Sequence, residues 1–330
     1  MIITQTPLRI SFLGGGTDYP EYFREYGGET LATSIDKYVT ISVHPLTQFV
    51  DYRVRVHYSV LETAKKLDEI EHTTARECMR YFNVDGGVEI YYSDDLPART
   101  GLGSSSAATV GLLHALHIMR GDSTSPEELA MEAIHVERSL VRSRIGSQDQ
   151  YACALGGLRH FRFSPDGTVS TVPIELSQKR ILELEERLLL LYTGRQRNSH
   201  DILDEQVERT RGRRNDDGLH ALKGLVKKGV DILSGEGDVK EFGRILHEGW
   251  EIKRALSGKV STPEIDALYA KARDAGAIGG KLLGAGGGGF LLLFVEPDAR
   301  RAVTNALGLP EAPFALERGG TRCIFSNHHS

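Results

Sequence analysis

Cysteine is scarce in this chain of 330 residues, which contains only three copies. They stand far apart, at Cys78, Cys153 and Cys323, and none belongs to a C-x-x-C pair. An odd number of isolated cysteines predicts neither a disulfide framework nor a zinc site of the usual spacing. We therefore expect reduced thiols, as in a cytoplasmic protein.

Long apolar runs are also missing. The longest is FLLLFV at residues 290–295, which has the length of one strand, whereas a membrane-spanning helix needs roughly 20 residues. The opening residues MIITQTPLRISF lack the basic segment and apolar core of a secretion signal. The sequence therefore predicts a protein that works in the cytoplasm and has no membrane partner.

An excess of positive charge is absent as well, because 40 Lys and Arg stand against 45 Asp and Glu, a formal net charge of −5. A nucleic-acid-binding surface needs a basic face that displaces counterions from phosphates. We therefore expect no nucleic-acid partner, although a few local arginines would suffice for a small anionic substrate. With 40% hydrophobic residues, the chain is long enough for two domains of roughly 150 residues each.

The pattern of apolar residues predicts an α+β fold, in which strands of the antiparallel type occur together with clustered helices. We expect domains at residues 1–170 and 171–330, with the boundary near 165–180. Predicted strands lie at residues 1–13, 31–44, 49–58, 88–93, 157–163, 188–192, 290–295 and 323–326. Predicted helices lie at residues 61–82, 104–119, 126–141, 147–154, 199–211, 217–234, 238–256, 263–275 and 298–307.

The first of three glycine-rich segments follows the opening strand. That strand carries Arg9, and three glycines at residues 14–16 and then Asp18 come after it. Glycines let the backbone approach a ligand closely, so the segment is a candidate binding site. A strand that ends in a loose turn is the alternative interpretation.

The second segment, GLGSSSA at residues 101–107, leads directly into a predicted helix. Free N–H groups and the positive end of the dipole make a helix N-terminus an anion site. Hydroxyl groups there can bind phosphate or a magnesium ion. An ordinary serine N-cap is the alternative, but three serines and two glycines exceed what a cap requires.

The third segment is KLLGAGGGGF, which contains G-x-G-x-x-G at Gly284, Gly286 and Gly289. A Rossmann fingerprint follows a strand and opens a helix, whereas these glycines follow the predicted helix 263–275 and open a strand. A Walker A loop is also absent, because Lys281 is followed by Leu282 rather than by serine or threonine. A nucleotide must therefore be held in another way.

These three segments, in this order and at this spacing, resemble the kinase superfamily named after galactokinase, homoserine kinase, mevalonate kinase and phosphomevalonate kinase (GHMP). The resemblance spans essentially the whole chain. It implies an N-terminal domain like ribosomal protein S5 domain 2, a C-terminal ferredoxin-like domain, and an active site between them that uses ATP and Mg²⁺.

Within this superfamily, the stretches LGGGTDYPEYF, GSQDQYACALGG and KLLGAGGGGF look most like bacterial D-glycero-D-manno-heptose 7-phosphate kinases. Those enzymes phosphorylate the anomeric C1 hydroxyl to give heptose 1,7-bisphosphate, which feeds nucleotide-activated heptose for surface polysaccharide. Galactokinase carries Glu-His where this chain has Gly15 and Gly16. This departure makes galactose a poor substrate candidate and suggests room for a bulkier sugar.

The resemblance implies a catalytic pair. Asp149 matches the aspartate that accepts the hydroxyl proton, and Arg9 matches an arginine that keeps this carboxylate ionised and neutralises charge on the transferred group. Without the resemblance, Asp149 can equally be interpreted as an acidic residue that stabilises a helix start. The alternative interpretation of Arg9 is a strand residue exposed to water. Asp18 matches the residue that accepts hydrogen bonds from sugar hydroxyls.

Magnesium takes oxygen ligands, and the resemblance implies Ser105 and Glu137 as its protein ligands. Ser104 or Ser106 could replace Ser105 if the register differs by one, and Glu137 could instead lie on a solvated helix face. The implied ATP-binding residues are Gly101, Leu102, Gly103, Ser104, Ser105, Ser106 and Ala107. The implied substrate-binding residues are Arg9, Gly15, Gly16, Thr17, Asp18, Asp149, Gly286 and Gly287.

A 7-phosphate on the sugar needs a cation. The candidates from the sequence are Arg195 and Arg197, which follow the strand predicted at 188–192, because a planar guanidinium suits two-point phosphate contact. Lys281 could also reach a phosphate, although an exposed lysine is as good an interpretation.

Three alternatives stay open. The acceptor could be another sugar, of the fucose or galactose type, or a mevalonate-type alcohol. The chain could also be a ligand sensor without catalysis on the same fold, although such proteins lose catalytic positions that are present here. Whether the protein forms a homodimer is left open.

Overall fold

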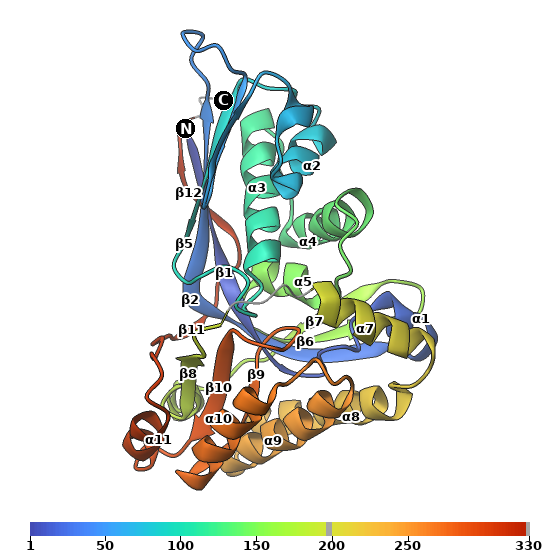
Figure 1. Ribbon diagram of the computed structural model, residues 1–330, viewed down its shortest axis with the longest axis vertical. Helices are drawn as coiled ribbons and strands as arrows, with labels where there is room; N and C mark the ends of the chain where they lie inside the picture. The colour runs from blue at the N-terminus through green and yellow to red at the C-terminus, as the bar shows by residue number, and fades with distance from the viewer. Residues whose placement is uncertain (196–199, 328–330) are drawn as a thin grey trace.

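The computed structural model describes residues 1–195 and 200–327. In this part of the chain, one sheet of nine strands runs β12-β1-β2-β5-β3-β4 along its main path (Figure 1). At its centre lies the antiparallel pair of β1 (Ile2–Leu13) and β2 (Gly28–Pro45). The remaining strands of this sheet are β3 (Val54–His57), β4 (Leu61–Ala64), β5 (Val88–Asp94), β6 (Leu158–Phe163), β7 (Val169–Pro173), β11 (Leu316–Glu317) and β12 (Arg322–Ser326).

One face of this sheet is covered by a layer of helices, of which α3 (Ser104–Arg120) packs across β1 and β2 (Figure 1). Left-handed glycines, Gly103 and Gly121, flank α3 at its two ends, a conformation that favours a residue without a Cβ atom. The other helices of this layer are α2 (Thr73–Tyr81), α4 (Pro126–His135), which continues as a π turn (Val136–Leu140), and α5 (Gln148–Leu155).

A second, antiparallel sheet has the order β8-β10-β9, formed by β8 (Leu188–Tyr192), β10 (Phe290–Val295) and β9 (Ala277–Leu282). Every residue of β10 is buried, because both faces of this strand are covered. The helices that accompany this sheet are α6 (Gln178–Glu185), α8 (Asp216–Ser234), α9 (Lys240–Ala255), α10 (Pro263–Asp274) and α11 (Arg300–Leu307). This arrangement confirms the predicted α+β class.

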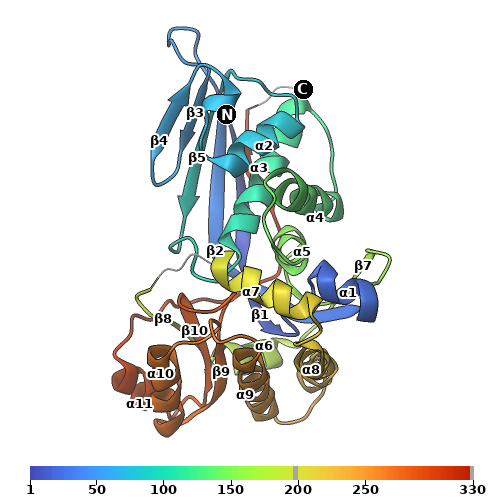
Figure 2. The ribbon, with the colours of Figure 1, turned by 45° about the vertical axis from the view of Figure 1, so that its right-hand side comes forward.

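The two sheets share one apolar core, which fixes the position of one relative to the other. Helices α8 and α9 contact β1 from below, and the ring of Phe12 lies edge-on against Phe242 at 5.2 Å between centroids. Two further helices, α1 (Pro20–Tyr26) and α7 (His200–Arg211), contact each other beside this junction (Figure 2). None of the described helices is both long and apolar enough to cross a membrane.

The chain crosses between the two sheets more than once. The predicted boundary at 170 falls inside β7, which pairs with β6 in the first sheet. The last strands, β11 and β12, return to pair with β2 and β1. We keep the two-domain division as a proposal, with the second sheet and its helices as the centre of the second domain.

Several predicted elements differ from the structure. The helix expected at 61–82 is three elements: β4 pairs with β3, a 3₁₀ turn spans Leu67–Glu69, and only α2 is α-helical. The strand expected at 49–58 is shortened to β3. The helix expected at 126–141 changes to the π turn after His135. Local spacing could not predict these changes, since they depend on pairing with distant segments.

Strand β9 was missed, and its glycines explain why. Gly279 and Gly280 give the segment low strand propensity, yet a Cβ atom at Gly279 would overlap the carbonyl oxygen of Gly243 on α9. The strand uses glycine because a helix lies directly against it. The third glycine-rich segment therefore connects two antiparallel strands, rather than a helix and a strand as predicted.

Candidate active site

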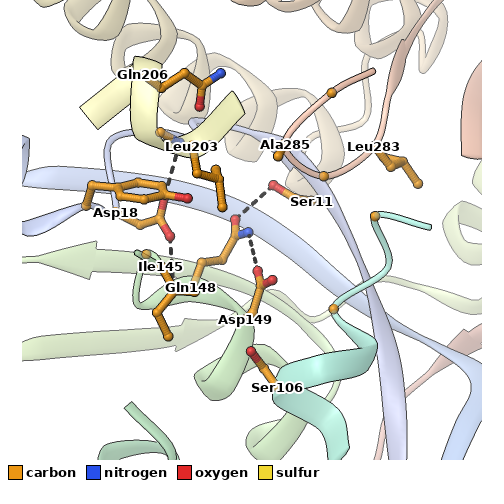
Figure 3. A pocket seen from close by; sticks show the side chains of 18 of the residues that line it. Ser11, Asp18, Ser106, Ile145, Gln148, Asp149, Leu203, Gln206, Leu283 and Ala285 are labelled. Atoms are coloured by element: carbon orange, nitrogen blue, oxygen red, sulfur yellow. Dashed lines mark hydrogen bonds between the residues drawn. The ribbon is translucent and has the colours of Figure 1, made fainter. Parts of the chain in front are cut away.

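A pocket opens where four segments meet: the end of β1, the start of α3, the start of α5 and the loop between β9 and β10. Figure 3 shows Asp149 and Ser106 at the bottom of the view, Leu283 and Ala285 from the β9–β10 loop on one side, and Leu203 and Gln206 from α7 above. The three glycine-rich segments of the sequence therefore line one common cavity.

An ion pair between Arg9 and Asp149 lies in the wall of this pocket. The guanidinium donates from Nε to Oδ1 of Asp149 at 2.8 Å and from Nη2 to Oδ2 at 2.6 Å. Its Nη1 donates to the carbonyl oxygen of Gly101 at 2.6 Å. Arg9 is buried, and a two-point pair of this kind fixes the orientation of the carboxylate. Arg9 thereby links Asp149 to the glycine-serine loop.

Asp18 lies on the other side of Asp149. Its Oδ2 accepts from the backbone N–H of Gln148 at 3.2 Å and its Oδ1 from that of Gly16 at 3.1 Å. Burial, followed by the negative charge of Asp149, raises the pKa of Asp18, while these hydrogen bonds oppose the shift. The Gln148 side chain accepts from Ser11 at 2.9 Å and donates to Asp149 at 3.2 Å, as Figure 3 shows.

The loop before α3 has the backbone that an anion site requires. Gly101 and Gly103 have φ values of 89° and 77°, and no side chain in the described part of the chain caps the N-terminus of α3. The first N–H groups of a helix have no partner within the helix, so those of residues 104–106 are available to a ligand. The predicted binding residues Leu102 and Ala107 are fully buried and are not part of the described pocket lining.

The third glycine loop and Arg9, on the strand before the first glycine loop, both contact the second glycine loop. A Cβ atom on Gly284 would come within 2.5 Å of the Cα of Gly101, and one on Gly101 would overlap the carbonyl oxygen of Leu283. Gly103 lies against Arg9 in the same way, since a Cβ atom on Gly103 would be 3.0 Å from Cγ of the arginine. The glycines are therefore needed for contact between backbones as well as for access to a ligand.

Glu137 lies in the π turn that continues α4, a feature often found at functional sites. Its carboxylate is buried and accepts hydrogen bonds from Ser106 and Thr109, both at 3.0 Å, from Ser105 at 3.4 Å and from the side-chain amide of Gln150. Burial raises the pKa of Glu137, and these hydrogen bonds oppose the shift. Glu137 is therefore no solvated helix residue, which was the alternative interpretation.

These groups fit a magnesium ion. Carboxylate and hydroxyl oxygens are the hard donors that Mg²⁺ prefers, and it commonly takes one or two protein ligands with phosphate oxygens and water. The side-chain oxygen of Gln150 is buried beside Glu137 and has no hydrogen-bond partner among the described residues. The described residues contain no cluster of three acidic, histidine or cysteine side chains that could hold an ion by themselves, so a phosphate would have to complete this site.

Several predicted substrate residues lie in the pocket wall, and others do not. Gly15, Gly16 and Gly286 line the cavity together with Arg9, Asp18 and Asp149. The hydroxyl of Thr17 donates instead to the carbonyl oxygens of Gly14 and Glu29, at 2.8 and 2.7 Å, and holds the loop together. Gly287 donates its N–H to Val260 at 2.9 Å and is not part of the described lining.

Of the two predicted phosphate-binding arginines, Arg195 is not part of the described wall of this cavity. It pairs with Glu264 at 3.4 Å, and its side chain is 52% exposed. Arg197 lies outside the described residues. Sequence alone placed Arg195 near the site because it follows β8, but could not give the direction of its side chain.

The pocket wall also contains Lys281, which the sequence had suggested as a phosphate contact, and further residues that sequence reasoning missed. Lys253 from α9 and Lys281 from β9 both line the pocket and are buried. Lys281 donates to the carbonyl oxygens of Ser11 and Phe12 at 2.8 and 2.9 Å, so it is not the exposed lysine that the alternative assumed. Helix α7 contributes Leu203, Gln206, Val207 and Thr210. A lysine on a polar-faced helix carries no sequence signal for burial, which is why Lys253 was not identified.

Comparison with known proteins agrees with this geometry. Residues 63–157 match the family described as GHMP kinases N terminal domain, and residues 222–309 match GHMP kinases C terminal. Together the two matches cover more than half of the chain, in the expected order. The chain belongs to the GHMP kinases, and it is an ATP-dependent kinase.

The individual proteins that this chain resembles include several sugar kinases. The chain is 29% identical to a D-glycero-alpha-D-manno-heptose 7-phosphate kinase of Campylobacter jejuni over 93% of both chains. A crystal structure of a D-glycero-D-manno-heptose 1-phosphate kinase from Bacteroides thetaiotaomicron has a TM-score of 0.81 and 26% identity, covering 99% of this chain and all of that one. The chain is also 25% identical to an L-fucokinase/L-fucose-1-P guanylyltransferase of Bacteroides fragilis, over 94% of this chain and 37% of that protein.

Proposed function

We propose that this protein transfers the γ-phosphoryl group of ATP to the anomeric C1 hydroxyl of D-glycero-D-manno-heptose 7-phosphate. The product would be heptose 1,7-bisphosphate, a precursor of nucleotide-activated heptose for surface polysaccharide. The observation that carries this proposal is the Arg9–Asp149 pair, held between the glycine-serine loop and Asp18 in one pocket. The similarity to the Campylobacter heptose 7-phosphate kinase over nearly the full length supports the choice of sugar.

In this proposal, Asp149 accepts the proton of the attacking hydroxyl. A general base must reach its proton through a hydrogen bond, and it acts best in a fixed orientation. Arg9 donates to both carboxylate oxygens and so fixes the orientation of the carboxylate. The guanidinium also lies beside the phosphate loop, through Gly101, where it can offset negative charge that builds up during transfer.

We further propose that ATP places its phosphates against the free N–H groups at the start of α3, and that Glu137 and Ser105 hold the Mg²⁺ ion. When bound, the ion neutralises phosphate charge and orients the γ-phosphoryl group. Glu137, from the π turn after α4, lies within hydrogen-bond range of Ser105 and Ser106 in the first turn of α3, which also carries the proposed phosphate donors. Ser106 is the register alternative to Ser105.

For the sugar, the proposal uses Asp18 as the acceptor of hydroxyl hydrogen bonds, with Gly15 and Gly16 leaving space beside it. Asp18 is already fixed by two backbone N–H groups, and its position next to Asp149 would bring a bound hydroxyl to the base. The free state of all three cysteines also supports the proposed cytoplasmic location.

A substrate panel tests the proposal. The purified protein is incubated with Mg·ATP and heptose 7-phosphate, unphosphorylated heptose, fucose, galactose or mevalonate, and ADP release and product mass are measured. We expect the highest kcat/KM for heptose 7-phosphate and a product that carries two phosphates. A clear preference for fucose would instead support a second candidate function, the phosphorylation of fucose. The similarity to the Bacteroides fragilis fucokinase favours this alternative.

A further inference from the structure

Lys253 is a buried cation in the pocket wall that the roles proposed above do not use. It lies in the last turn of α9 and is 9% exposed. Its ammonium group donates to the carbonyl oxygen of Gly284 at 2.5 Å, and this is its one hydrogen bond with the described residues. Because an ammonium group has three N–H donors, two of them remain without an acceptor in the described part of the chain.

No described carboxylate forms an ion pair with this group within 4.0 Å. Buried lysines are normally paired, since an isolated buried charge is costly. The neighbouring buried basic side chains differ in this respect. Arg9 is occupied by Asp149 and Gly101, and Lys281 uses two of its donors on the backbone of β1. Among these three buried basic side chains of the described pocket, Lys253 therefore makes the fewest hydrogen bonds with the described residues.

The electrostatic surroundings of Lys253 favour an incoming anion. Burial, followed by the charge of Arg9, lowers its pKa to about 8, and Asp18 and Asp149 oppose this shift only in part. Lys281 adds a further amine from β9, whose own pKa is lowered by burial and by Lys253. A phosphoryl oxygen near Lys253 would offset this cost and restore its full positive charge.

The position of Lys253 shows where such an anion would lie. Its hydrogen-bond partner Gly284 contacts Gly101 of the phosphate loop, and Gly101 accepts a hydrogen bond from Arg9. Lys253 thus reaches the point where the loop, Arg9 and the β9–β10 turn come together. This point lies at the transfer centre of the proposed reaction.

We propose that Lys253 binds a phosphoryl oxygen of the substrates. The proposal rests on the function proposed above. Two phosphoryl groups could supply this oxygen. One is the γ-phosphoryl group of ATP, which the contact between Gly284 and Gly101 favours. The other is the phosphate that the acceptor sugar already carries. In either case Lys253, and not Arg195, supplies the cation within the described pocket.

The test replaces Lys253 with methionine, which keeps the length of the apolar stem but removes the charge, and with arginine, which keeps the charge. Lys223→Met is the matched control, because Lys223 also donates to backbone carbonyls, those of Tyr26 and Gly27, and is not part of the described pocket lining. Circular dichroism and thermal unfolding establish that each variant is folded. Steady-state kinetics then use the acceptor chosen by the substrate panel, with and without its phosphate.

The two sources give different results. Contact with the transferred group lowers kcat about 10²-fold or more in Lys253→Met for both forms of the acceptor. Contact with the acceptor's phosphate raises KM at least about 10-fold for the phosphorylated form alone. In both cases Lys253→Arg recovers part of the loss. If kcat and KM of a folded Lys253→Met both match those of Lys223→Met, the proposal is wrong.

A binding measurement keeps the test independent of the acceptor. The dissociation constants of ADP and of a non-hydrolysable ATP analogue are measured by calorimetry for the parent protein and for Lys253→Met. We expect the variant to bind ADP normally and to lose affinity for the analogue if Lys253 contacts the γ-phosphate. If the substrate panel identifies another sugar, the function proposed above fails, while this comparison still decides whether Lys253 contacts the γ-phosphate of ATP.

Discussion

Arg9 and Asp149 stand 140 positions apart in the chain, yet the guanidinium of one holds both carboxylate oxygens of the other. Arg9 comes from the central strand β1 and Asp149 from the first turn of α5. Arg9 donates a third hydrogen bond, to the carbonyl oxygen of Gly101 in the loop before α3. One arginine therefore sets the relative position of the proposed base and the proposed phosphate site.

The first prediction concerns this pair. Asp149→Asn keeps the shape of the side chain but removes the proton acceptor, and we expect kcat to fall about 10²- to 10⁴-fold. The KM for ATP should change little, because Asp149 does not belong to the loop before α3. Steady-state kinetics with the preferred acceptor measure both quantities.

Arg9→Met provides the cross-check. Because the two residues act as a unit, the double variant should lose less activity than the product of the two single losses. Fully multiplicative losses would mean that Arg9 does not act through Asp149. An Asp149→Asn variant with the parent kcat would exclude Asp149 as the base.

The second prediction concerns Glu137. Its pKa is raised by burial, so the charged form destabilises the folded protein at neutral pH and the neutral form does not. Glu137→Gln should therefore raise the melting temperature at pH 7 without magnesium, by on the order of 2 °C. The gain should shrink as the pH is lowered, because the parent carboxylate then becomes protonated in the folded state.

The same variant should respond weakly to magnesium. Mg·ATP stabilises the parent protein by binding to the folded state, and we expect much of this stabilisation to be lost in Glu137→Gln. Glu132→Gln is a suitable control on the preceding helix α4, because Glu132 contacts His117 rather than the serines of the phosphate loop. Equal stabilisation of both variants by Mg·ATP would contradict the proposed ligand role of Glu137.

The third prediction uses two glycines with different surroundings. Gly101→Ala introduces a Cβ atom against the carbonyl oxygen of Leu283 at a φ of 89°. We expect weaker ATP binding and a loss of about 1–3 kcal/mol of stability, measured by calorimetry and urea unfolding. Gly224 lies inside α8, where an added Cβ atom would meet no atom of the described residues within 4 Å, so Gly224→Ala should stabilise the protein by about 0.5–1 kcal/mol. Equal effects of the two substitutions would show that the contact between the glycine loops is unimportant.

Features with a local cause could be predicted from the sequence. The start of α3 follows from the glycines and serines that precede an apolar helical pattern, and α10 begins at a Thr-Pro pair with acidic residues in its first turn. The pairing of Arg9 with Asp149 depends on two distant segments, so only the family resemblance could suggest it. That resemblance identified positions, and the structure added their contacts.

Features that depend on tertiary packing could not be predicted. Lys253 has the same sequence context as the solvated lysines of other helices, and its burial results from the approach of the β9–β10 turn. Strand β9 contains glycines that argue against a strand, and it forms because β10 and α9 hold it on two sides. Arg195 follows a strand that was correctly predicted, but its pairing with Glu264 on α10 is a tertiary contact.

The last prediction concerns Lys281, which links β9 to the backbone of β1. Burial lowers its pKa well below the ordinary value of a lysine, so the unfolded chain binds this proton at pH values where the folded protein does not. Stability from this group therefore increases as the pH rises toward about 10, by at most about 1.4 kcal/mol per pH unit. Lys281→Met removes this dependence. The free energy of unfolding of the parent minus that of the variant should therefore increase between pH 7 and pH 9. Urea unfolding at pH 7, 8 and 9 measures the difference. A difference between parent and Lys281→Met that stays constant with pH would show that Lys281 carries its proton in the folded protein as it does in water.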